Sequence, residues 1–198
     1  MAYHGHIQIV KEYFSKFDRA PSFLEVGVDR GVTFISLVAY LARNHKEFCA
    51  IGIDVLVQEQ VRIMLQNLDL AGAQSAFLIE ENSLSALPKL NDRTFDVVLL
   101  DGDHNYHTVS QELVMIEPIV TPGGAIIVDD YDGKWSMTDL WYANRDGYQN
   151  VQGTTKTVDT LKHGVKPAVD EWLASHPTWK AHKLMAGEPI VLLNSAPA

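Results

Sequence analysis

Phe95–Asp103 is Phe-Asp-Val-Val-Leu-Leu-Asp-Gly-Asp, and Ala125–Asp130 repeats its form as Ala-Ile-Ile-Val-Asp-Asp. Each segment is a short apolar run, rich in β-branched residues, that ends abruptly in acidic residues. Apolar runs without polar alternation predict strands of a parallel sheet that helices cover on both faces. The acids then follow the carboxyl ends of the strands, which form the ligand-binding edge of open α/β sheets.

Three of these acids, Asp101, Asp129 and Asp130, predict a binding site for a divalent cation. If the two strands are neighbours, Asp101 and Asp129 lie about 5 Å apart across the sheet. Carboxylates at that distance repel one another unless a proton or a cation lies between them. Oxygen ligands of this kind suit Mg²⁺ or Mn²⁺ better than zinc. The alternative is a structural role for all three acids, with Asp130 pointing into solvent.

Outward from these strands, the chain alternates between strand and helix patterns. We expect strands at 23–26, 48–53, 76–79, 95–100 and 125–128, and helices at 6–17, 32–43, 58–70, 83–90 and 109–120, with Ser83 as an N-cap. A helix at 165–174 then precedes strands at 179–185 and 190–193, whose short link is typical of an antiparallel hairpin. The order predicts an α/β fold with a doubly wound, mostly parallel sheet of seven strands. We expect a single domain, 1–198, in which residues 1–20 carry the N-terminal helix.

The segment 131–164 lacks clear periodicity and is long for a connection inside a compact domain. Its large aromatic side chains include Trp135, Trp141, Tyr142 and Tyr148, and it also carries Lys134 and Arg145. Long segments of this kind are usually active-site lids or disordered loops. We expect a lid whose aromatic residues enclose a flat or sugar-like acceptor. Packing of these residues against the sheet edge, or in a dimer contact, is the alternative.

The loop after the first strand, Glu25-Val26-Gly27-Val28-Asp29-Arg30-Gly31, predicts a ligand that carries no phosphates. It lacks the middle glycine of the dinucleotide-binding fingerprint. Its acids, Glu25 and Asp29, oppose a pyrophosphate but favour an ammonium or a sulfonium. Asp54, at the end of the second strand, is placed to accept hydrogen bonds from a ribose. The combination favours S-adenosylmethionine. Alternatively, the two glycines serve tight packing and Asp54 caps the next helix.

Composition narrows the classes of partner and the compartment. The formal net charge of −9 argues against duplex nucleic acid or an anionic membrane surface as the main partner, since both need clustered cations. No apolar stretch approaches the roughly 20 residues of a membrane span, and the first residues show no signal-peptide pattern. The single cysteine, Cys49, cannot form an internal disulfide. We therefore expect a cytoplasmic protein, with the oligomeric state left open.

Four segments together resemble one known family. They are Phe-Leu-Glu-Val-Gly, Ile-Gly-Ile-Asp, the Asp-Gly-Asp-His-x-Tyr that ends the first quoted run, and Thr-Pro-Gly-Gly-Ala-Ile-Ile-Val-Asp-Asp-Tyr. The chain resembles the class I S-adenosylmethionine-dependent methyltransferases, which have a Rossmann-like fold. More narrowly, it is similar to the metal-dependent O-methyltransferases of small molecules and sugars, including the macrolide-sugar and aminocoumarin enzymes.

This resemblance implies a role for individual residues. The cofactor would be held by Glu25, Gly27 and Gly31 at its methionine part, by Asp54 at the ribose, by Asn82 and Ser83 at the adenine, and also by Asp101. The metal would be held by Asp101, Asp129 and Asp130. His104 matches the position of the general base, although some relatives use the position of Asp103 instead. The acceptor would be a small molecule or a sugar.

Other functions compete with this one. A metal-free methyltransferase that acts on nitrogen or carbon would be insensitive to chelators. A nicotinamide-dependent oxidoreductase would need the missing glycine and a Tyr-x-x-x-Lys pair that the sequence lacks. A methyltransferase-like binding module would bind the cofactor without methylating any acceptor.

Overall fold

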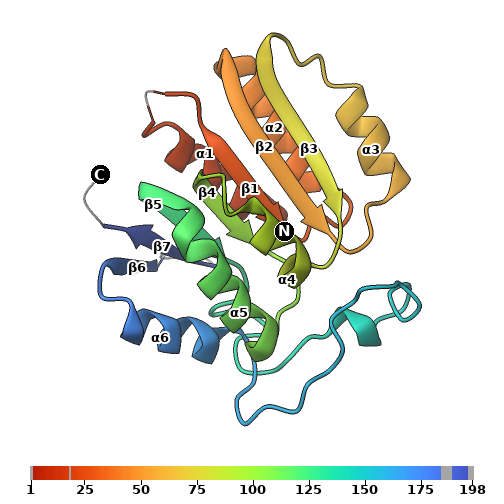
Figure 1. Ribbon diagram of the computed structural model, residues 1–198, viewed down its shortest axis with the longest axis vertical. Helices are drawn as coiled ribbons and strands as arrows, with labels where there is room; N and C mark the ends of the chain where they lie inside the picture. Colours follow the sequence, from red (N-terminus) through yellow and green to blue (C-terminus); the bar gives the residue numbers. More distant parts are fainter. Residues whose placement is uncertain (1, 18, 184–188, 196–198) are drawn as a thin grey trace.

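The computed structural model describes residues 2–17, 19–183 and 189–195. Its centre is a seven-stranded sheet in the order β3-β2-β1-β4-β5-β7-β6 (Figure 1). The strands are β1 (Ser22–Val26), β2 (Glu47–Asp54), β3 (Ala73–Glu80), β4 (Phe95–Leu100), β5 (Val120–Val128), β6 (Trp179–Lys183) and β7 (Ile190–Asn194). The predicted seven-stranded, doubly wound sheet is confirmed.

Strands β1 to β5 are parallel to one another, whereas β7 runs antiparallel to both β5 and β6. The predicted C-terminal hairpin is therefore confirmed. The final part of the strand expected at 179–185 lies outside the described residues. Strand β5 begins at Val120, before the expected start at residue 125, and its pairing with β4 is irregular, with a register shift between Phe95 and Val97.

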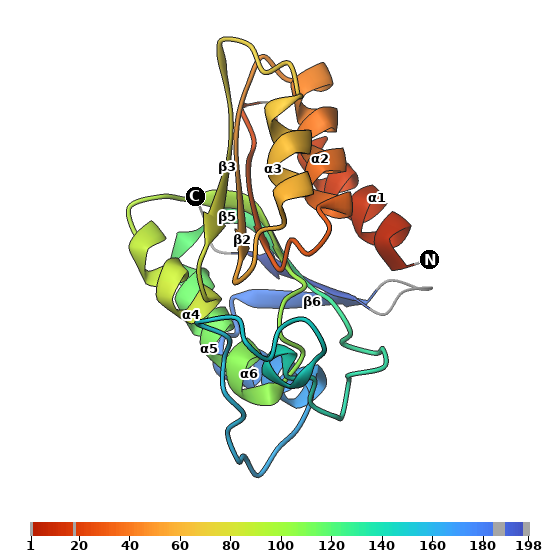
Figure 2. The same ribbon diagram turned by 90° about the vertical axis from the view of Figure 1, so that its right-hand side faces the viewer.

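The helices cover both faces of the sheet (Figure 2). In the order of the chain they are α1 (Ala2–Phe14), α2 (Val32–Asn44), α3 (Glu59–Gln66), α4 (Ser83–Ala86), α5 (Tyr106–Ile116) and α6 (Val165–Ser175), with short 3-10 helices η1 (Leu87–Leu90), η2 (Glu117–Ile119) and η3 (Tyr142–Asn144). Helices α1, α2 and α3 lie on one face and α4, α5 and α6 on the other. Among the described residues, no helix is long and apolar enough to cross a membrane.

This layering explains why the strands lack a polar face. All six residues of β4 are buried, and successive side chains enter the two different cores. Leu24 and Val98 pack with α5 and α6, whereas Phe23 and Val97 pack with α1 and α2. Each core excludes water from one face, so a polar residue on either face needs buried partners.

Several helix ends differ from the sequence-based prediction, and the expected N-cap at Ser83 is wrong. The side chain of Asn82 instead accepts a hydrogen bond from the backbone N–H of Leu84 and caps α4. The helix expected from residue 109 starts at Tyr106, because Asn105 caps it by accepting from the Thr108 N–H at 2.8 Å. Both capping side chains are asparagines, which are strong N-caps.

Asp96 is the charged residue of β4, and it is fully buried. Its carboxylate pairs with the Arg19 guanidinium and accepts hydrogen bonds from the Ser22 N–H at 2.8 Å and the Thr121 hydroxyl at 2.9 Å. These bonds connect the start of β1, β4 and the irregular start of β5. The buried charge is thus fully paired, at the edge of the sheet opposite to the strand carboxyl ends.

We expect Asp96→Asn to lower the free energy of unfolding by about 2–3 kcal/mol, because an amide cannot accept from every donor and loses the charge-assisted bonds. Urea denaturation followed by circular dichroism measures this loss. Asp92→Asn, at an exposed neighbouring position, is the matched control and should stay within about 0.5 kcal/mol of the unsubstituted protein. A loss of equal size in the two variants would contradict the network's role.

The opposite edge of the sheet brings the predicted site residues together. Ladder hydrogen bonds continue past the strand ends, from the Asp101 N–H to the Val26 carbonyl at 2.9 Å and from the Asp129 N–H to the Leu100 carbonyl at 3.0 Å. Asp101 therefore lies between β1 and β5, directly beside Asp129. The segment 131–164 runs beneath this edge (Figure 1).

Candidate functional site

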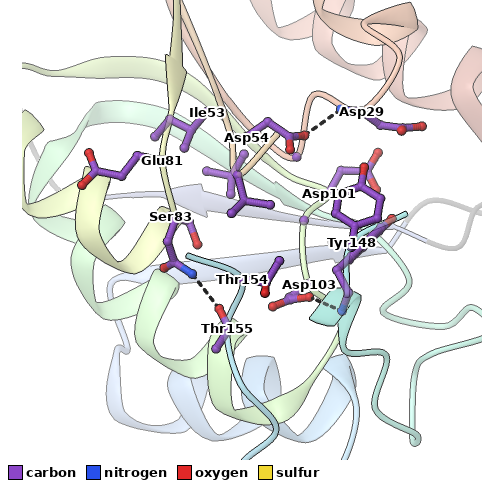
Figure 3. A pocket seen from close by; sticks show the side chains of 16 residues that line it. Asp29, Ile53, Asp54, Glu81, Ser83, Asp101, Asp103, Tyr148, Thr154 and Thr155 are labelled. Atoms are coloured by element: carbon purple, nitrogen blue, oxygen red, sulfur yellow. Dashed lines mark hydrogen bonds between the residues drawn. The ribbon is translucent and has the colours of Figure 1, made fainter. Parts of the chain in front are cut away.

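A cavity of about 540 Å³, counting the part open to solvent, lies at the carboxyl edge of β1, β2 and β4. Figure 3 shows side chains from the strand ends and from the segment 131–164 facing it. The lining residues include Gly27, Asp29, Asp54, Asn82, Ser83, Asp101, Asp103, Tyr142, Tyr148, Thr154 and Thr155.

Gly27 lets two loops approach each other at the floor of this cavity. Its φ angle is +91°, and a Cβ atom there would lie 2.1 Å from the Asp101 carbonyl oxygen and 2.7 Å from the Gly102 Cα. Gly31, at φ +76°, is not among the residues that line the cavity. A Cβ atom on Gly31 would lie 2.8 Å from Val61 Cγ1. The absence of a side chain at Gly31 therefore allows α2 to pack closely against α3.

Asp54 is positioned by backbone donors on both of its oxygens. Oδ2 accepts from the Asp29 N–H at 2.8 Å, which Figure 3 marks, and Oδ1 accepts from the Leu56 N–H at 2.9 Å. Burial raises the pKa of this carboxyl, and the backbone hydrogen bonds oppose that shift. Each carboxylate oxygen has a second lone pair, so this fixed group can still accept from a ligand hydroxyl.

Asn82 and Ser83 face the cavity from the start of α4. The Asn82 amide also donates to the Gly153 carbonyl at 2.7 Å and to the Thr155 hydroxyl at 2.9 Å. Asn82 therefore attaches the segment 131–164 to the wall of the cavity, besides capping α4. This second contact depends on a partner more than 70 residues away.

A second, smaller cavity shares Asp101 with the first and is also lined by Glu25 and Thr33. Glu25 is buried, and its Oε2 atom has no hydrogen-bond partner among the described residues. Burial, together with the charge of Asp54, raises the pKa of Glu25 well above its usual range. A buried carboxyl with a free acceptor atom fits a cationic ligand group, such as the ammonium or sulfonium predicted from the sequence.

The three predicted cation ligands converge beside these cavities and are accompanied by two histidines. The oxygens of Asp129 and Asp130 and a ring nitrogen of His104 lie within 4.8 Å of one another, and so do donor atoms of His6, Asp101 and Asp129. Asp130 takes a left-handed conformation, with φ +56°, which is uncommon for a non-glycine residue and clusters at functional sites. The backbone therefore turns sharply to direct Asp130 into the cluster, and the expected alternative, an Asp130 in solvent, does not occur: the residue is buried.

The charges in this cluster oppose one another. Burial and the neighbouring carboxylate of Asp129 raise the pKa of Asp101 well above its usual range. Burial acts in the same direction on Asp129, but the hydrogen bond and charge of His6 and the charge of His104 outweigh it and hold the Asp129 pKa at about 2. Asp129 is therefore ionised and disfavours ionisation of the adjacent Asp101; a bound cation would relieve this repulsion.

His104 and Asp103, the two predicted base positions, point to different places. His104 is buried in the acid cluster, with Nε2 3.7 Å from Asp101 Oδ1 and Nδ1 3.6 Å from Asp130 Oδ2. Burial lowers its pKa, although the carboxylates around it oppose the shift. Asp103 faces the large cavity, where Oδ1 accepts from the Tyr142 N–H at 2.9 Å (Figure 3).

His6, on α1, is the site residue that sequence reasoning missed. Its Nε2 atom lies 2.8 Å from Asp129 Oδ1, across 123 residues of sequence. The only signal in the sequence was a histidine at the start of an amphipathic helix. No local pattern specifies which end of that helix packs against the strand ends, so this contact could not be found without the tertiary structure.

The segment 131–164 is fixed at several points. The Leu140 N–H donates to the His104 carbonyl at 2.9 Å, and Asp139 accepts from the N–H groups of Tyr106 at 3.0 Å and Gly164 at 2.7 Å. Of its aromatic residues, Tyr142 and Tyr148 line the large cavity and contact each other edge to face, whereas Trp141 is buried beside the His107 ring. Within this one segment, some aromatic residues therefore line the cavity and another packs against the body of the protein.

Glu112, on α5, is a further buried acid next to this site. Burial raises its pKa to about 8, with a hydrogen bond to Ser83 opposing the shift and the charge of Asp103 adding to it. Between its ordinary value of 4.5 and about 8, the folded protein keeps a proton that the unfolded chain releases. The free energy of unfolding therefore falls as pH rises through this range, by at most about 1.4 kcal/mol per pH unit for this group.

We expect Glu112→Gln to make the free energy of unfolding less dependent on pH between pH 5.5 and pH 8, because the amide stays neutral. Urea denaturation at three pH values in that range measures the slope. Glu59→Gln, at an exposed position of α3, should leave the slope of the unsubstituted protein unchanged. Equal slopes in all three proteins would show that Glu112 is already ionised when folded.

Comparison with known proteins gives the class of the chain. A family model described as a methyltransferase domain matches residues 24–131, more than half of the 198 residues. The chain belongs to this methyltransferase family. The match contains the first glycine loop, Asp54 and the three acids of the cluster. The methyltransferase family expected from the resemblance is thereby confirmed, and so is the fold.

Individual relatives are more distant. An uncharacterized protein of Acanthamoeba polyphaga mimivirus is 24% identical over 143 residues, covering 68% of this chain and 63% of that protein, so the chain spans less than two thirds of that relative's length. Among solved structures, the TDP-rhamnose 3′-O-methyltransferase of calicheamicin biosynthesis has a TM-score of 0.61 at 14% identity, covering 96% of this chain and 79% of that one. The mycinamycin-pathway methyltransferase, bound to Mg, S-adenosylhomocysteine and mycinamycin VI, has a TM-score of 0.57 at 15% identity, covering 93% and 48%. The tomaymycin O-methyltransferase of Streptomyces achromogenes, bound to S-adenosylmethionine, has a TM-score of 0.57 at 19% identity, covering 89% and 74%.

Proposed function

We propose that the protein is an S-adenosylmethionine-dependent O-methyltransferase that requires a divalent cation and methylates a hydroxyl of a small molecule or a sugar. One observation carries this proposal: Asp101 lines both cavities and also belongs to the acid cluster. The methyl donor and the cation would therefore share a wall. An acceptor hydroxyl next to the cation would then face the methyl group.

The cavities support a definite placement of the cofactor. The methionine part would lie over Gly27, with its ammonium near the free acceptor atom of Glu25. The ribose would meet Asp54, and the adenine would lie between Asn82 and Ser83 on one side and the segment 131–164 on the other. Gly31 would act indirectly, through the packing that positions the loop.

Methyl transfer to oxygen is an in-line displacement that needs an oriented acceptor and the removal of its proton. A cation held by Asp101, Asp129 and Asp130 would lower the pKa of the hydroxyl that it binds. His104 is the base that the geometry favours, because its ring lies between Asp101 and Asp130. Asp103 is a positioning residue in this proposal, because its carboxylate already accepts from the backbone of the lid segment.

The remaining partner assignments rest on charge and on the relatives. Tyr142 and Tyr148 present aromatic surface on which a flat acceptor or a sugar can pack. The names of two structural relatives include TDP-rhamnose and mycinamycin VI, which agrees with a small-molecule or sugar acceptor. The net charge of −9 argues against nucleic acid or a membrane surface, and the cytoplasm remains our proposed compartment.

Calorimetry with S-adenosylhomocysteine, followed by transfer of labelled methyl groups to a panel of nucleotide sugars and catechols, tests the proposal. We expect tight cofactor binding and activity that EDTA abolishes and added divalent cation restores. Cofactor binding with EDTA-resistant methylation would select the metal-free alternative on nitrogen or carbon. Binding without any methylation would favour a non-catalytic module.

A further inference from the structure

The acid cluster receives a side chain from α1, a helix outside the residues that the methyltransferase family model matches. His6 shares the buried side of α1 with Val10 and Phe14, which are fully buried and pack in the core under α2. The spacing of four residues places these three side chains along one stripe of the helix. An apolar residue at position 6 would simply continue this stripe. The buried imidazole of His6 therefore needs polar partners that an apolar side chain would not need.

Hydrogen bonding satisfies only one side of the His6 ring. Nε2 is bonded to Asp129 Oδ1 at 2.8 Å, whereas Nδ1 lies 3.7 Å from Asp101 Oδ2, too far for a hydrogen bond. Nδ1 is buried and has no hydrogen-bond partner within the described part of the chain. His6 itself is only 2% exposed, so bulk water does not solvate this atom. A buried nitrogen that faces a carboxylate without bonding to it is a vacant ligand position.

The acids and the two histidines form two sets of possible metal-binding atoms. One consists of His6, Asp101 and Asp129, the other of His104, Asp129 and Asp130, and the three donor atoms of each set lie within 4.8 Å of one another. Asp129 belongs to both sets. Carboxylates alone suit Mg²⁺, but imidazole nitrogen suits the divalent first-row transition metals, for which affinity of mixed nitrogen and oxygen sites is far higher.

We propose that His6 is a metal ligand, and that the site consequently prefers a divalent first-row transition metal to Mg²⁺. The inference rests on the proposed function, since it names the class of cation at the same site, and it narrows the Mg²⁺ or Mn²⁺ expected from the acids alone to the transition metals. A bound cation would also connect α1 to the ends of β4 and β5. Metal binding should therefore stabilise α1 as well as the site.

The test uses the full chain, stripped of metal with a chelator and dialysed, and titrated separately with Co²⁺ and Mg²⁺ in a calorimeter. We expect the unsubstituted protein to bind Co²⁺ at least about 100-fold more tightly than Mg²⁺. His6→Gln should weaken Co²⁺ binding by about 30-fold or more and change Mg²⁺ binding less than threefold, since one nitrogen ligand is lost. His182→Gln, at an exposed position of β6, is the matched control and should bind both ions like the unsubstituted protein.

Two further measurements keep the test decisive. His6→Leu extends the buried apolar stripe, so it supplies a folded variant if the glutamine is not tolerated. Hydrogen exchange of α1 amides should slow on addition of Co²⁺ in the unsubstituted protein and should not respond in either variant. Binding of Co²⁺ by His6→Leu within threefold of the unsubstituted protein would overturn the inference.

Failure of this inference is distinguishable from failure of the proposed function. If the unsubstituted protein binds neither ion, the metal part of the proposed function fails together with the inference. If it binds Mg²⁺ as tightly as Co²⁺, and both His6 variants do the same, only the role of His6 is wrong. Calorimetry with S-adenosylhomocysteine on the same samples reports the cofactor site independently of either ion.

Discussion

Methyl transfer by Asp129→Asn is expected to be about 1000-fold slower than by the unsubstituted protein, because cation-assisted removal of the acceptor proton contributes several kcal/mol. Asp129 belongs to both sets of donor atoms, so its loss weakens every arrangement of the cation. It is not among the residues that line the two cavities. Binding of S-adenosylhomocysteine should therefore stay within about threefold of its normal value, as measured by calorimetry on the same sample.

The matched control for this substitution is Asp132→Asn. Asp132 is an exposed residue three positions along the chain, and its carboxylate contacts Lys166 outside the acid cluster. We expect this variant to keep its activity within twofold of the unsubstituted protein. Unchanged turnover of Asp129→Asn, with cofactor bound, would refute the cation mechanism and favour direct deprotonation by a base.

Gly27→Ala is expected to destabilise the fold by more than about 4 kcal/mol and to abolish cofactor binding. The added Cβ atom would lie 2.1 Å from the carbonyl oxygen of Asp101, and real Cβ atoms essentially never come within 3.0 Å of another group. The obstacle is backbone, which cannot rotate away as a flexible side chain can. Relief would require the β1 loop and the β4 loop to separate, and both form the floor of the cavity.

Gly72→Ala separates this clash from simple backbone strain. Gly72 also has a positive φ angle, +62°, but a Cβ atom there would meet no atom within 4 Å. We expect a loss of only about 1 kcal/mol in this control, from the left-handed conformation alone. Urea denaturation and calorimetry with S-adenosylhomocysteine on both variants measure the difference. Equal losses at the two positions would show that the β1 and β4 loops are not as close as the structure places them.

The apolar runs of β4 and β5 were the most reliable signal in the sequence. Burial on both faces makes such strands continuous apolar runs, so the first charged residues mark where each strand ends. The acids at their ends could therefore be placed next to each other from the pattern alone. The same reasoning identified the turn at Gly27, because a glycine directly after a buried strand indicates a close approach of backbone.

Local patterns were a weaker guide where long-range contacts decide the outcome. A Cβ atom on Gly31 would meet Val61, and the contact of Gly31 with the cofactor stays a prediction. Helix α4 is capped by Asn82 and not by Ser83 as expected, and Asn82 also donates a hydrogen bond to the segment 131–164. The segment itself has no regular period because its backbone combines isolated turns, such as the bond from the Ser136 N–H to the Gly133 carbonyl, with bonds to distant partners such as His104.

The sequence alone determined the alternation of strands and helices and the position of the acids at the strand ends, because local hydrophobic periodicity and turn residues carry that information. The methyltransferase class followed from the resemblance of four sequence motifs to a known family. Tertiary structure alone decided that His6 joins the acids, that His104 and not Asp103 faces them, and that Tyr142 and Tyr148 cover the cavity. These contacts join residues separated by tens of positions or more along the chain. They form only when the helices have packed on both faces of the sheet. No local pattern in a chain records which distant surface a helix or a lid will meet.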